Sequence, residues 1–193
     1  MKCLVLASQS EGRRKLLEEA GFRFEVIVSH FDEESIRDSD SCELVKKLSI
    51  AKARAVLEKA PKNAVILGGD QVVQIGDAIV GKPKSEEELR RWLAVLANFF
   101  ADIFQGYAVI DAETKKEWIG VDTARVYFGA IPSNEVGGWV ATGKPFARAG
   151  GFSLREEPSA RWISSIEGER STIIGMPMHI VAPILKQLLR KIY

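Results

Sequence analysis

The sequence predicts an α/β fold in a single domain. Short apolar runs typical of buried strands alternate along the chain with segments whose apolar residues recur at helical spacing. The chain has 193 residues, a length that fits one domain or two interlocked lobes. Hydrophobic residues make up 46% and charged residues 27%, so the chain can bury the core of an ordinary globular protein.

The first elements are predicted as a strand, a helix and a strand. Residues 2–7 form an apolar run that is typical of a buried strand. A helix is expected over residues 11–20, because Gly21 suits the position that follows a helix end. A second strand is expected over residues 22–28, and an acidic loop follows it.

A long helix is predicted over residues 41–59, with Ser41 as its N-cap. Lys52 falls beside the apolar stripe of this helix, whereas most of its other charged residues fall on the opposite side. Two interpretations are open. The aliphatic stem of Lys52 reaches past the edge of the core into water, or its ammonium group points into a cleft. The residues of the predicted stripe are Leu44, Leu48, Ala51 and Ala55.

The remainder of the chain continues the alternation. After the strand over residues 65–73, Gly76-Asp77 suits a tight hairpin turn between strands over 72–75 and 78–80, and Ser85 begins a helix with a capping box. The later predicted elements are strands over 103–110 and 118–127, a helix over 132–143, a strand over 162–166 and a C-terminal helix after Pro177.

Composition excludes several classes of protein. The net charge of +1 gives no general attraction to nucleic acid or membranes. Cys3 and Cys42 are too few and too far apart for a disulfide framework or a cysteine metal site. No apolar run approaches the ~20 residues of a membrane span, and the apolar start is too short for a signal peptide. We therefore expect a cytoplasmic protein whose partners are neither nucleic acids nor membranes.

Asp70 and Lys82 are the first candidates for a catalytic site. Asp70 is expected where the strand over 65–73 ends, and ligands of α/β sheets bind beyond the carboxyl ends of strands. Lys82 follows on a loop stiffened by Gly81 and Pro83. A carboxylate that holds a metal or a water, with a lysine that binds phosphate, suits phosphate-ester chemistry. By themselves, Asp70 and Lys82 fit an aspartate in an ordinary turn beside a solvated lysine at least as well as they fit a catalytic site.

The loop between the first strand and the first helix has the composition of a phosphate site. Backbone N–H groups at a helix N-terminus attract anions, and the hydroxyls of Ser8 and Ser10 with the Arg13 guanidinium would complete a cradle. A polar helix cap with solvated arginines is the alternative, since the glycines of a Walker or dinucleotide loop are missing. His30 and His179 stand alone, so neither predicts a metal site.

Short motifs are spread over nearly the whole chain, and their order and spacing are specific. They include Leu6-Ala7-Ser8-Gln9-Ser10, Ala51-Lys52-Ala53, Gly69-Asp70-Gln71-Val72-Val73, Gly81-Lys82-Pro83, Gly143-Lys144-Pro145 and Gly175-Met176-Pro177. In this order they resemble the Maf family of nucleoside triphosphate pyrophosphatases, also called septum-formation inhibitor proteins.

The resemblance implies a hydrolase that splits a nucleoside triphosphate between its α- and β-phosphates. The products would be the monophosphate and pyrophosphate, and Mg²⁺ or Mn²⁺ would be required. The implied fold is an elongated α/β structure in which two lobes with flanking helices enclose a central cleft, similar to the inosine triphosphate pyrophosphatases. Residues 1–193 would form this one domain, and a homodimer is compatible with it.

The family motifs also imply which residues carry the chemistry. Glu33 and Asp70 would hold the metal, and Asp70 would orient or deprotonate the attacking water. The sequence leaves open whether Asp70 is the base or a metal ligand. The residues of this chain that match the motifs are Ser8, Arg13, Glu33, Lys52, Asp70, Gln71 and Lys82.

Three cations and one hydroxyl would bind the phosphates. Arg13, Lys52 and Lys82 would neutralise the triphosphate and the charge that develops on the leaving pyrophosphate. Ser8 would bind a phosphate oxygen. This assignment favours the interpretation in which Lys52 points into a cleft.

The residues that would recognise the base depart from the common family pattern. Asp70-Gln71 replaces the usual Asp-Thr, and residues 97–101 lack the usual lysine and histidine; both features resemble the branch that prefers 7-methylguanosine triphosphate. Where that branch has Glu, this chain has Arg155, with Glu156 next to it. Because Arg155 would repel a cationic base, we expect Glu156 to face the base and Gln71 to contact a base edge. A different substrate is the alternative.

Two other functions are compatible with the sequence. A non-enzymatic nucleotide-binding protein that regulates cell division would explain the altered loop residues, and a nucleotidyltransferase would use the same metal and phosphate chemistry. The retained set of Glu33, Lys52, Asp70 and Lys82 favours the hydrolase. A protein that only binds nucleotides has no chemical need for both carboxylates and both lysines.

Overall fold

The computed structural model describes residues 2–189 and confirms the predicted α/β class. Within these residues, seven strands form one sheet in the order β2-β1-β3-β5-β6-β7, with β4 paired to β3. β1 runs parallel to β2 and β3, whereas β4 is antiparallel to β3 and β7 is antiparallel to β6. The strands are β1 (Cys3–Leu6), β2 (Phe24–Val26), β3 (Ala64–Ile75), β4 (Ala78–Val80), β5 (Phe100–Asp111), β6 (Glu117–Phe128) and β7 (Ile163–Glu167).

The helices agree with the predicted order but differ in detail. Asp40, not Ser41, caps α2, because its carboxylate accepts hydrogen bonds from the N–H groups of Cys42 and Glu43. α2 ends at Arg54, five residues earlier than predicted. The helices are α1 (Glu11–Glu19), α2 (Ser41–Arg54), α3 (Glu86–Leu96), α4 (Ser133–Ala141), α5 (Arg170–Ile174) and α6 (Met178–Leu189), with 3₁₀ turns at Glu33–Ser35, Lys144–Ala147, Ala149–Gly151 and Ser159–Trp162. The prediction missed α5 and the 3₁₀ turns, which are too short to show a helical period.

The chain forms two compact units. Unit 1 consists of the described residues of Met1–Asp70, Gln105–Asp122 and Gly175–Tyr193, and unit 2 consists of Gln71–Phe104 and Thr123–Ile174. The cleft that the resemblance implies between two lobes stays a prediction.

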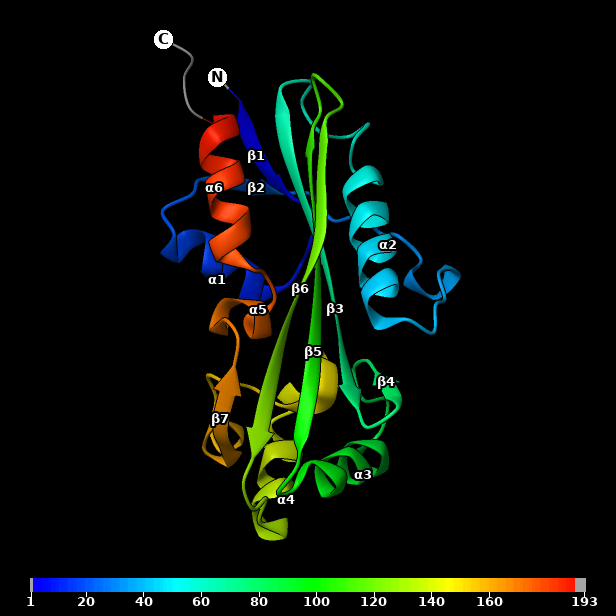
Figure 1. Cartoon of the computed structure of the whole chain (residues 1–193), viewed down its shortest axis with the longest axis vertical. Coiled ribbons are helices and arrows are strands. Elements are labelled where there is room, and N and C mark those ends of the chain that lie inside the picture. The colour runs from blue at the N-terminus through cyan, green and yellow to red at the C-terminus, as the bar shows by residue number, and fades with distance from the viewer. Residues whose placement is uncertain (1, 190–193) are drawn as a thin grey trace. The chain divides into compact units, whose positions relative to one another are not determined.

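Helices cover both faces of the sheet in unit 1 (Figure 1). α2 lies on one side of the strands, and α1 and α6 lie on the other. Successive residues of a strand face opposite sides, and β3 shows this clearly. A Cβ atom added to Gly68 would meet Ser49 and Ala53 of α2, whereas one added to Gly69 would meet Arg13 of α1 and Met176.

α2 approaches the sheet closely because two glycines face it. A Cβ atom at Gly68 would lie 2.5 Å from the backbone oxygen of Ser49, and one at Gly106 would lie 2.5 Å from Ser49 Oγ. The predicted apolar stripe is therefore wrong at Leu44, Ala51 and Ala55, which are only half-buried. The buried residues of α2 are Ser41, Val45, Leu48, Ser49, Lys52 and Ala53. Hydrophobic spacing identified the helix but not its inner face, which depends on the space beside the glycines.

Gly106→Ala should destabilise the protein by about 1–3 kcal/mol, as overpacking in a closely packed interior typically does. The added methyl group would collide with Ser49 Oγ and with the Val45 backbone oxygen, which cannot move independently of the helix. Urea unfolding measures the effect. Gly138→Ala is the control, because Gly138 lies in α4 with open space around its Cβ position and alanine favours helix there. Equal stability of Gly106→Ala and the parent would contradict the close approach of α2.

Unit 2 has its own core between the sheet and α3 and α4. Trp139 of α4 is fully buried, and its indole N–H donates to the Gly151 carbonyl oxygen at 2.7 Å. The predicted turn at Gly76 is confirmed, with φ of 59° between β3 and β4. Other buried members of this core are Val73, Leu89, Leu93, Leu96, Val126, Phe152 and Trp162.

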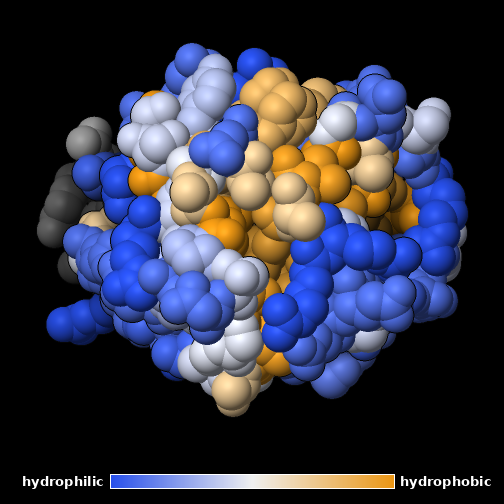
Figure 2. All heavy atoms as spheres, turned by 90° about the horizontal axis from the view of Figure 1, so that it is seen from below, coloured by the Kyte–Doolittle hydropathy of each residue, from blue (hydrophilic) through white to orange (hydrophobic). Residues whose placement is uncertain are grey.

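Few large hydrophobic side chains are classed as exposed on the described surface. Val26, Val95 and Phe99 are the large hydrophobic residues that are exposed among residues 2–189. Figure 2 shows one face on which hydrophobic residues gather between hydrophilic ones. None of the helices in the described part of the chain is both long enough and apolar enough to cross a membrane.

Candidate active site

Three charged side chains of unit 1 meet at Lys52. Its ammonium group donates a hydrogen bond to Asp70 Oδ1 and lies 2.9 Å from Glu33 Oε1. The side chains of Lys52 and Asp70 are 9% and 8% exposed, whereas that of Glu33 is 59% exposed. Because the Lys52 side chain is buried and paired, the interpretation in which it reaches into water is wrong. Lys52 connects a buried carboxylate with one that contacts solvent.

Asp70 lies inside β3, so the prediction that it ends the strand is wrong. β3 continues to Ile75 and pairs there with β4. Asp70 nevertheless lies beyond the last parallel pair of β1 and β3, Leu6 with Leu67. It therefore occupies the edge of the parallel part of the sheet at which α/β proteins bind ligands.

Burial raises the pKa of the Asp70 carboxyl group above its ordinary value of 3.8. Lys52 and Arg13 oppose this effect and favour the ionised carboxylate, whereas Glu33 adds to it. The side chain is thus more basic than an exposed aspartate. A raised pKa at a buried carboxylate with a specific cationic partner is a common feature of catalytic acids and bases.

Arg13 of α1 is held against the opposite side of β3. Its side chain is almost fully buried, with Nε donating to the Gly175 carbonyl oxygen at 2.8 Å and Nη1 donating to Ser8 Oγ at 2.9 Å. Burial lowers the pKa of Arg13, while Asp70 and Glu33 counteract that effect. A guanidinium remains charged under any ordinary condition. Ser8 and Arg13 thus form the hydroxyl and cation pair that was predicted for phosphate binding.

The carboxylates of Glu33 and Asp70 fit a divalent cation. Both are oxygen donors, which Mg²⁺ and Mn²⁺ prefer, and both converge on the Lys52 ammonium group. Mg²⁺ commonly binds through one or two carboxylates together with substrate phosphates. Among residues 2–189 there is no cluster of three or more His, Cys, Asp or Glu that could hold a metal. The substrate would therefore have to supply further ligands.

Gln71 and Lys82, two of the predicted site residues in unit 2, have different surroundings. Gln71 uses its side-chain N–H₂ group to donate to the carbonyl oxygens of Thr172 and Ile173, at 3.0 and 3.1 Å. Its side-chain oxygen is the group that would remain for a ligand, so we expect Gln71 to contact a base edge as an acceptor rather than as both donor and acceptor. Lys82 is exposed, and the preceding Gly81 accepts a backbone hydrogen bond from Gly150.

Glu156 is held by two cations of unit 2. Its Oε1 lies 3.0 Å from Lys144 Nζ, and its Oε2 accepts a hydrogen bond from Arg148. Burial opposes ionisation of Glu156, but Lys144 and Arg148 outweigh burial and lower its pKa. Arg155 is exposed. The hypothesis that Glu156 faces a base stays a prediction, and both its oxygens have protein partners in this structure.

Glu156→Gln should lower the free energy of unfolding by about 1 kcal/mol at neutral pH, because it removes charged hydrogen bonds at a partly buried site. The lowered pKa stabilises the folded state above the ordinary value of 4.5, and this stability is lost as the pH falls through the lowered pKa. Urea unfolding at pH 7 and below pH 4.5 should show the loss in the parent and a weaker pH dependence in the variant. A variant that changes the order of preferred substrates at unchanged stability would instead support contact with the base.

The structure brings together five of the predicted residues and adds one. The grouped residues of unit 1 are Ser8, Arg13, Glu33, Lys52 and Asp70, while Lys82, Gln71, Arg155 and Glu156 belong to unit 2. The sequence analysis did not identify Gln105, a fully buried residue of β5 beside Gly69. Its one signal in the sequence is a polar residue within the mainly apolar stretch of residues 103–110.

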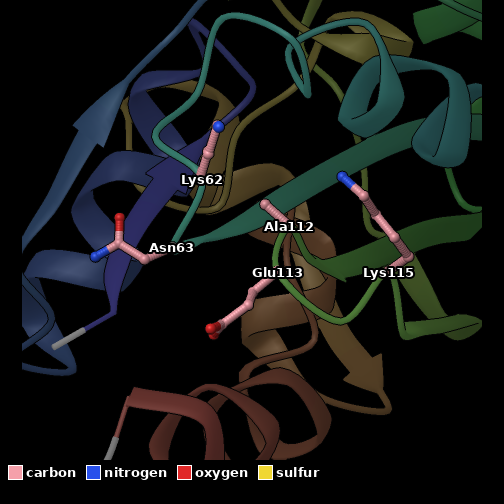
Figure 3. A pocket seen from close by; sticks show the side chains of 5 residues that line it. All are labelled: Lys62, Asn63, Ala112, Glu113 and Lys115. Carbon is pink, nitrogen blue, oxygen red and sulfur yellow. The ribbon is translucent and has the colours of Figure 1, made fainter.

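A cavity of about 420 Å³ in unit 1 lies apart from these residues. Figure 3 shows its lining from the loop before β3 and the turn after β5, with the two lysine side chains extending away from Glu113. It lies at the amino end of β3, whereas Asp70 lies beyond the parallel pairing with β1. The lining residues are Lys62, Asn63, Ala112, Glu113 and Lys115, none of which was predicted for the site.

Comparison with known proteins decides the family. The sequence profile described as Maf-like protein matches residues 3–188. The chain belongs to the Maf family. A protein named nucleoside triphosphate pyrophosphatase from Synechococcus elongatus is 36% identical over 187 residues, which cover 96% of this chain and 91% of that protein. A protein named dTTP/UTP pyrophosphatase from Alkaliphilus oremlandii is 32% identical over 186 residues, which cover 96% of each chain.

A solved structure of a HAM1 protein from Coxiella burnetii is also similar to this Maf protein. It is 18% identical and superimposes with a TM-score of 0.43. The match covers 68% of this chain and 75% of that chain.

Proposed function

We propose that this Maf protein hydrolyses a nucleoside triphosphate at the bond between the α- and β-phosphates, releasing the monophosphate and pyrophosphate. The observation that carries the proposal is the buried Asp70, hydrogen-bonded to Lys52 and beside Glu33. A carboxylate of raised basicity next to a cation can orient a water that attacks a phosphorus atom. The names of the relatives in the Synechococcus and Alkaliphilus species support the same reaction.

The cations of unit 1 would stabilise the charge of the substrate. Lys52 and Arg13 are almost fully buried, so a phosphate oxygen that reached them would be shielded from water. Charge stabilisation in such surroundings is stronger than in water and needs little rearrangement during the reaction. Ser8, which holds Nη1 of Arg13, would bind a phosphate oxygen. Lys82 of unit 2 is a further predicted phosphate-binding residue.

Glu33 and Asp70 are the residues that would hold Mg²⁺ or Mn²⁺. The cation would neutralise phosphate charge and complete the coordination of the triphosphate. Lys52 would then contact the phosphates or stay between the two carboxylates. In either position its positive charge would reduce the repulsion among these negatively charged groups.

The proposal also concerns which base the substrate carries and which residues contact it. The Gln71 amide would accept a hydrogen bond, because its N–H₂ group already donates to Thr172 and Ile173. The resemblance favours a guanine-type base such as 7-methylguanine, while the relative in Alkaliphilus is named for dTTP and UTP. The pairing of Glu156 with Lys144 and Arg148 weakens its attraction for a cationic base. We expect Glu156→Ala to alter the order of preferred nucleotides more than Arg155→Ala only if this pairing opens in the complex.

A nucleotide panel tests the function. Canonical triphosphates and 7-methylguanosine triphosphate would be incubated with Mg²⁺ or Mn²⁺, and pyrophosphate and orthophosphate would be quantified separately. We expect pyrophosphate as the primary product and loss of activity in EDTA. Orthophosphate as the first product, or full turnover in EDTA, would refute the proposal.

Two controls separate the competing functions. A non-enzymatic binding protein would bind nucleotides without turnover, which calorimetry with a non-hydrolysable triphosphate analogue detects. A nucleotidyltransferase would release pyrophosphate only with an acceptor, so the reaction in water alone distinguishes it from hydrolysis.

A further inference from the structure

Glu33 lies on a short turn that depends on contacts from the residue before it. Glu33–Ser35 is a single 3₁₀ turn, and the residues on either side of it, Asp32 and Ile36, have an extended backbone. The turn stands between β2 and α2, and its three residues are exposed. A turn of this length has too few internal hydrogen bonds to hold its own shape. The direction of the Glu33 side chain therefore depends on what fixes the turn.

Asp32 fixes the turn with both its side chain and its backbone. Its Oδ1 accepts a hydrogen bond from the Glu34 N–H group at 3.1 Å. Its carbonyl oxygen accepts hydrogen bonds from the Ser35 N–H group at 3.2 Å and from the Ser35 hydroxyl group at 2.6 Å. Aspartate is a favoured residue at this position of a helical turn, because its carboxylate satisfies a free N–H group. Asp32 thus binds the two residues that follow Glu33.

The other end of the segment is attached to α2, the helix that carries Lys52. Asp38 Oδ2 lies 2.6 Å from Lys47 Nζ, and Asp38 Oδ1 accepts a hydrogen bond from the Asp40 N–H group at 3.0 Å. The Glu33 carboxylate lies 2.9 Å from Lys52 Nζ although its side chain is 59% exposed. An exposed glutamate loses conformational freedom when it is held in one place. A fixed turn reduces the number of conformations that Glu33 can adopt.

We infer that Asp32 is a positioning residue for Glu33: its carboxylate holds the turn from which Glu33 reaches Lys52 and would reach a divalent cation. The inference rests on the proposed function, since it uses Glu33 as a metal ligand. The Asp32 carboxylate is engaged within the turn, so it acts through Glu33 and not as a further ligand. Groups that orient metal ligands typically change metal affinity by about 10–100-fold when they are removed.

Binding of Mn²⁺ tests the inference without turnover. Metal-free protein with a non-hydrolysable triphosphate analogue would be titrated with Mn²⁺, and the electron paramagnetic resonance signal of free Mn²⁺ would be recorded. We expect Asp32→Ala to weaken binding about tenfold and to raise the Mn²⁺ concentration for half-maximal pyrophosphate release by the same factor. The value of kcat at saturating Mn²⁺ should stay near that of the parent, since the reacting groups are unchanged.

Asp32→Asn distinguishes positioning from direct binding. Asparagine caps a helical turn about as well as aspartate, so this variant should retain the Mn²⁺ affinity of the parent. A loss as large as that of Asp32→Ala would overturn the inference, because the charge of Asp32 would then bind the cation itself. Urea unfolding should give both variants the stability of the parent, since the turn is exposed.

A control and a double-mutant cycle complete the test. Ser85→Ala removes a cap of the same kind from α3, where Ser85 Oγ accepts from the Glu88 N–H group at 3.1 Å, and it should keep the parent Mn²⁺ affinity. In the Glu33→Gln background, Asp32→Ala should cause no further loss of affinity. Additive losses would overturn the inference. Parent affinity in Asp32→Ala would also overturn it, whatever the stability of that variant.

The Mn²⁺ measurement separates this inference from the proposed function. If Asp32→Ala and Glu33→Gln both weaken Mn²⁺ binding but the parent releases no pyrophosphate from any triphosphate, the proposed reaction fails while the role of Asp32 stands. If turnover is confirmed and Asp32→Ala binds Mn²⁺ as the parent does, only the role of Asp32 fails. A parent protein that binds no Mn²⁺ would overturn the role of Asp32 whatever its turnover.

Discussion

Asp70→Asn should reduce turnover at least ~100-fold while the protein stays folded. Asparagine retains the shape of the side chain but can neither accept a proton from water nor supply a carboxylate to a metal. Loss of a general base or a metal ligand has effects of this size. Steady-state pyrophosphate release, compared with the parent at equal metal concentration, measures the result.

The stability of Asp70→Asn distinguishes chemistry from folding. Because burial raises the pKa of Asp70, the folded parent loses stability as the pH rises from about 3.8 through that raised pKa. Asparagine removes this contribution, and Lys52 keeps Glu33 as its partner. Asp111→Asn is the matched control, since Asp111 is also buried and paired with a lysine, Lys2. That variant should lose stability and keep its turnover, and a fully active Asp70→Asn would exclude Asp70 from the reaction.

Lys52→Ala should lower kcat/KM at least about tenfold, a loss of roughly 1.4 kcal/mol of transition-state stabilisation. It should also change the pH profile. Lys52 favours the ionised form of Asp70, so its removal allows burial to raise the pKa of Asp70 further. Activity that needs ionised Asp70 rises with pH through that pKa, and the rise should therefore move to higher pH in the variant. A profile of kcat/KM against pH measures both effects.

A lysine on the outer side of the same helix controls for the loss of charge. Lys46 pairs with Glu43 at 3.2 Å on the surface, where such ion pairs contribute little. Lys46→Ala should retain the kcat/KM and the pH profile of the parent. If Lys52→Ala behaved in the same way, the buried ion pair would have only a structural role.

Local patterns predicted most elements within a few residues of their bounds. The strand over 2–7, the helix over 11–20 and the turn at Gly76 correspond to β1, α1 and the β3–β4 connection. These elements depend on nearby residues, such as the Ser10 hydroxyl that caps α1 by accepting from the Arg13 N–H group. The short α5 spans five residues, too few to show a helical period, so periodicity could not locate it.

Sequence motifs identified some residues of the site, whereas others could be identified only from contacts between distant parts of the chain. Family motifs selected Lys52 and Asp70, and the direction of Lys52 on its helix already suggested an inner position. The motifs did not select Gln105, because its place beside Gly69 becomes visible only when β5 and β3 are placed side by side. Nor could the sequence show that Gln71 has both amide hydrogens engaged, since Thr172 and Ile173 lie about a hundred residues away.

The alternation along β3 has a consequence for the kinds of genetic change that the protein tolerates. Gly68 faces α2, Gly69 faces Arg13, and Asp70 faces Lys52 again. Insertion or deletion of one codon between Ala64 and Gly68 would exchange the two sides for every residue that follows in the strand. Asp70 would then point toward Arg13, and a side chain would replace hydrogen in a contact that only glycine permits. We therefore expect insertion or deletion of one residue in this segment to impair folding and activity more consistently than single substitutions do. The same length changes in the β3–β4 turn should be tolerated.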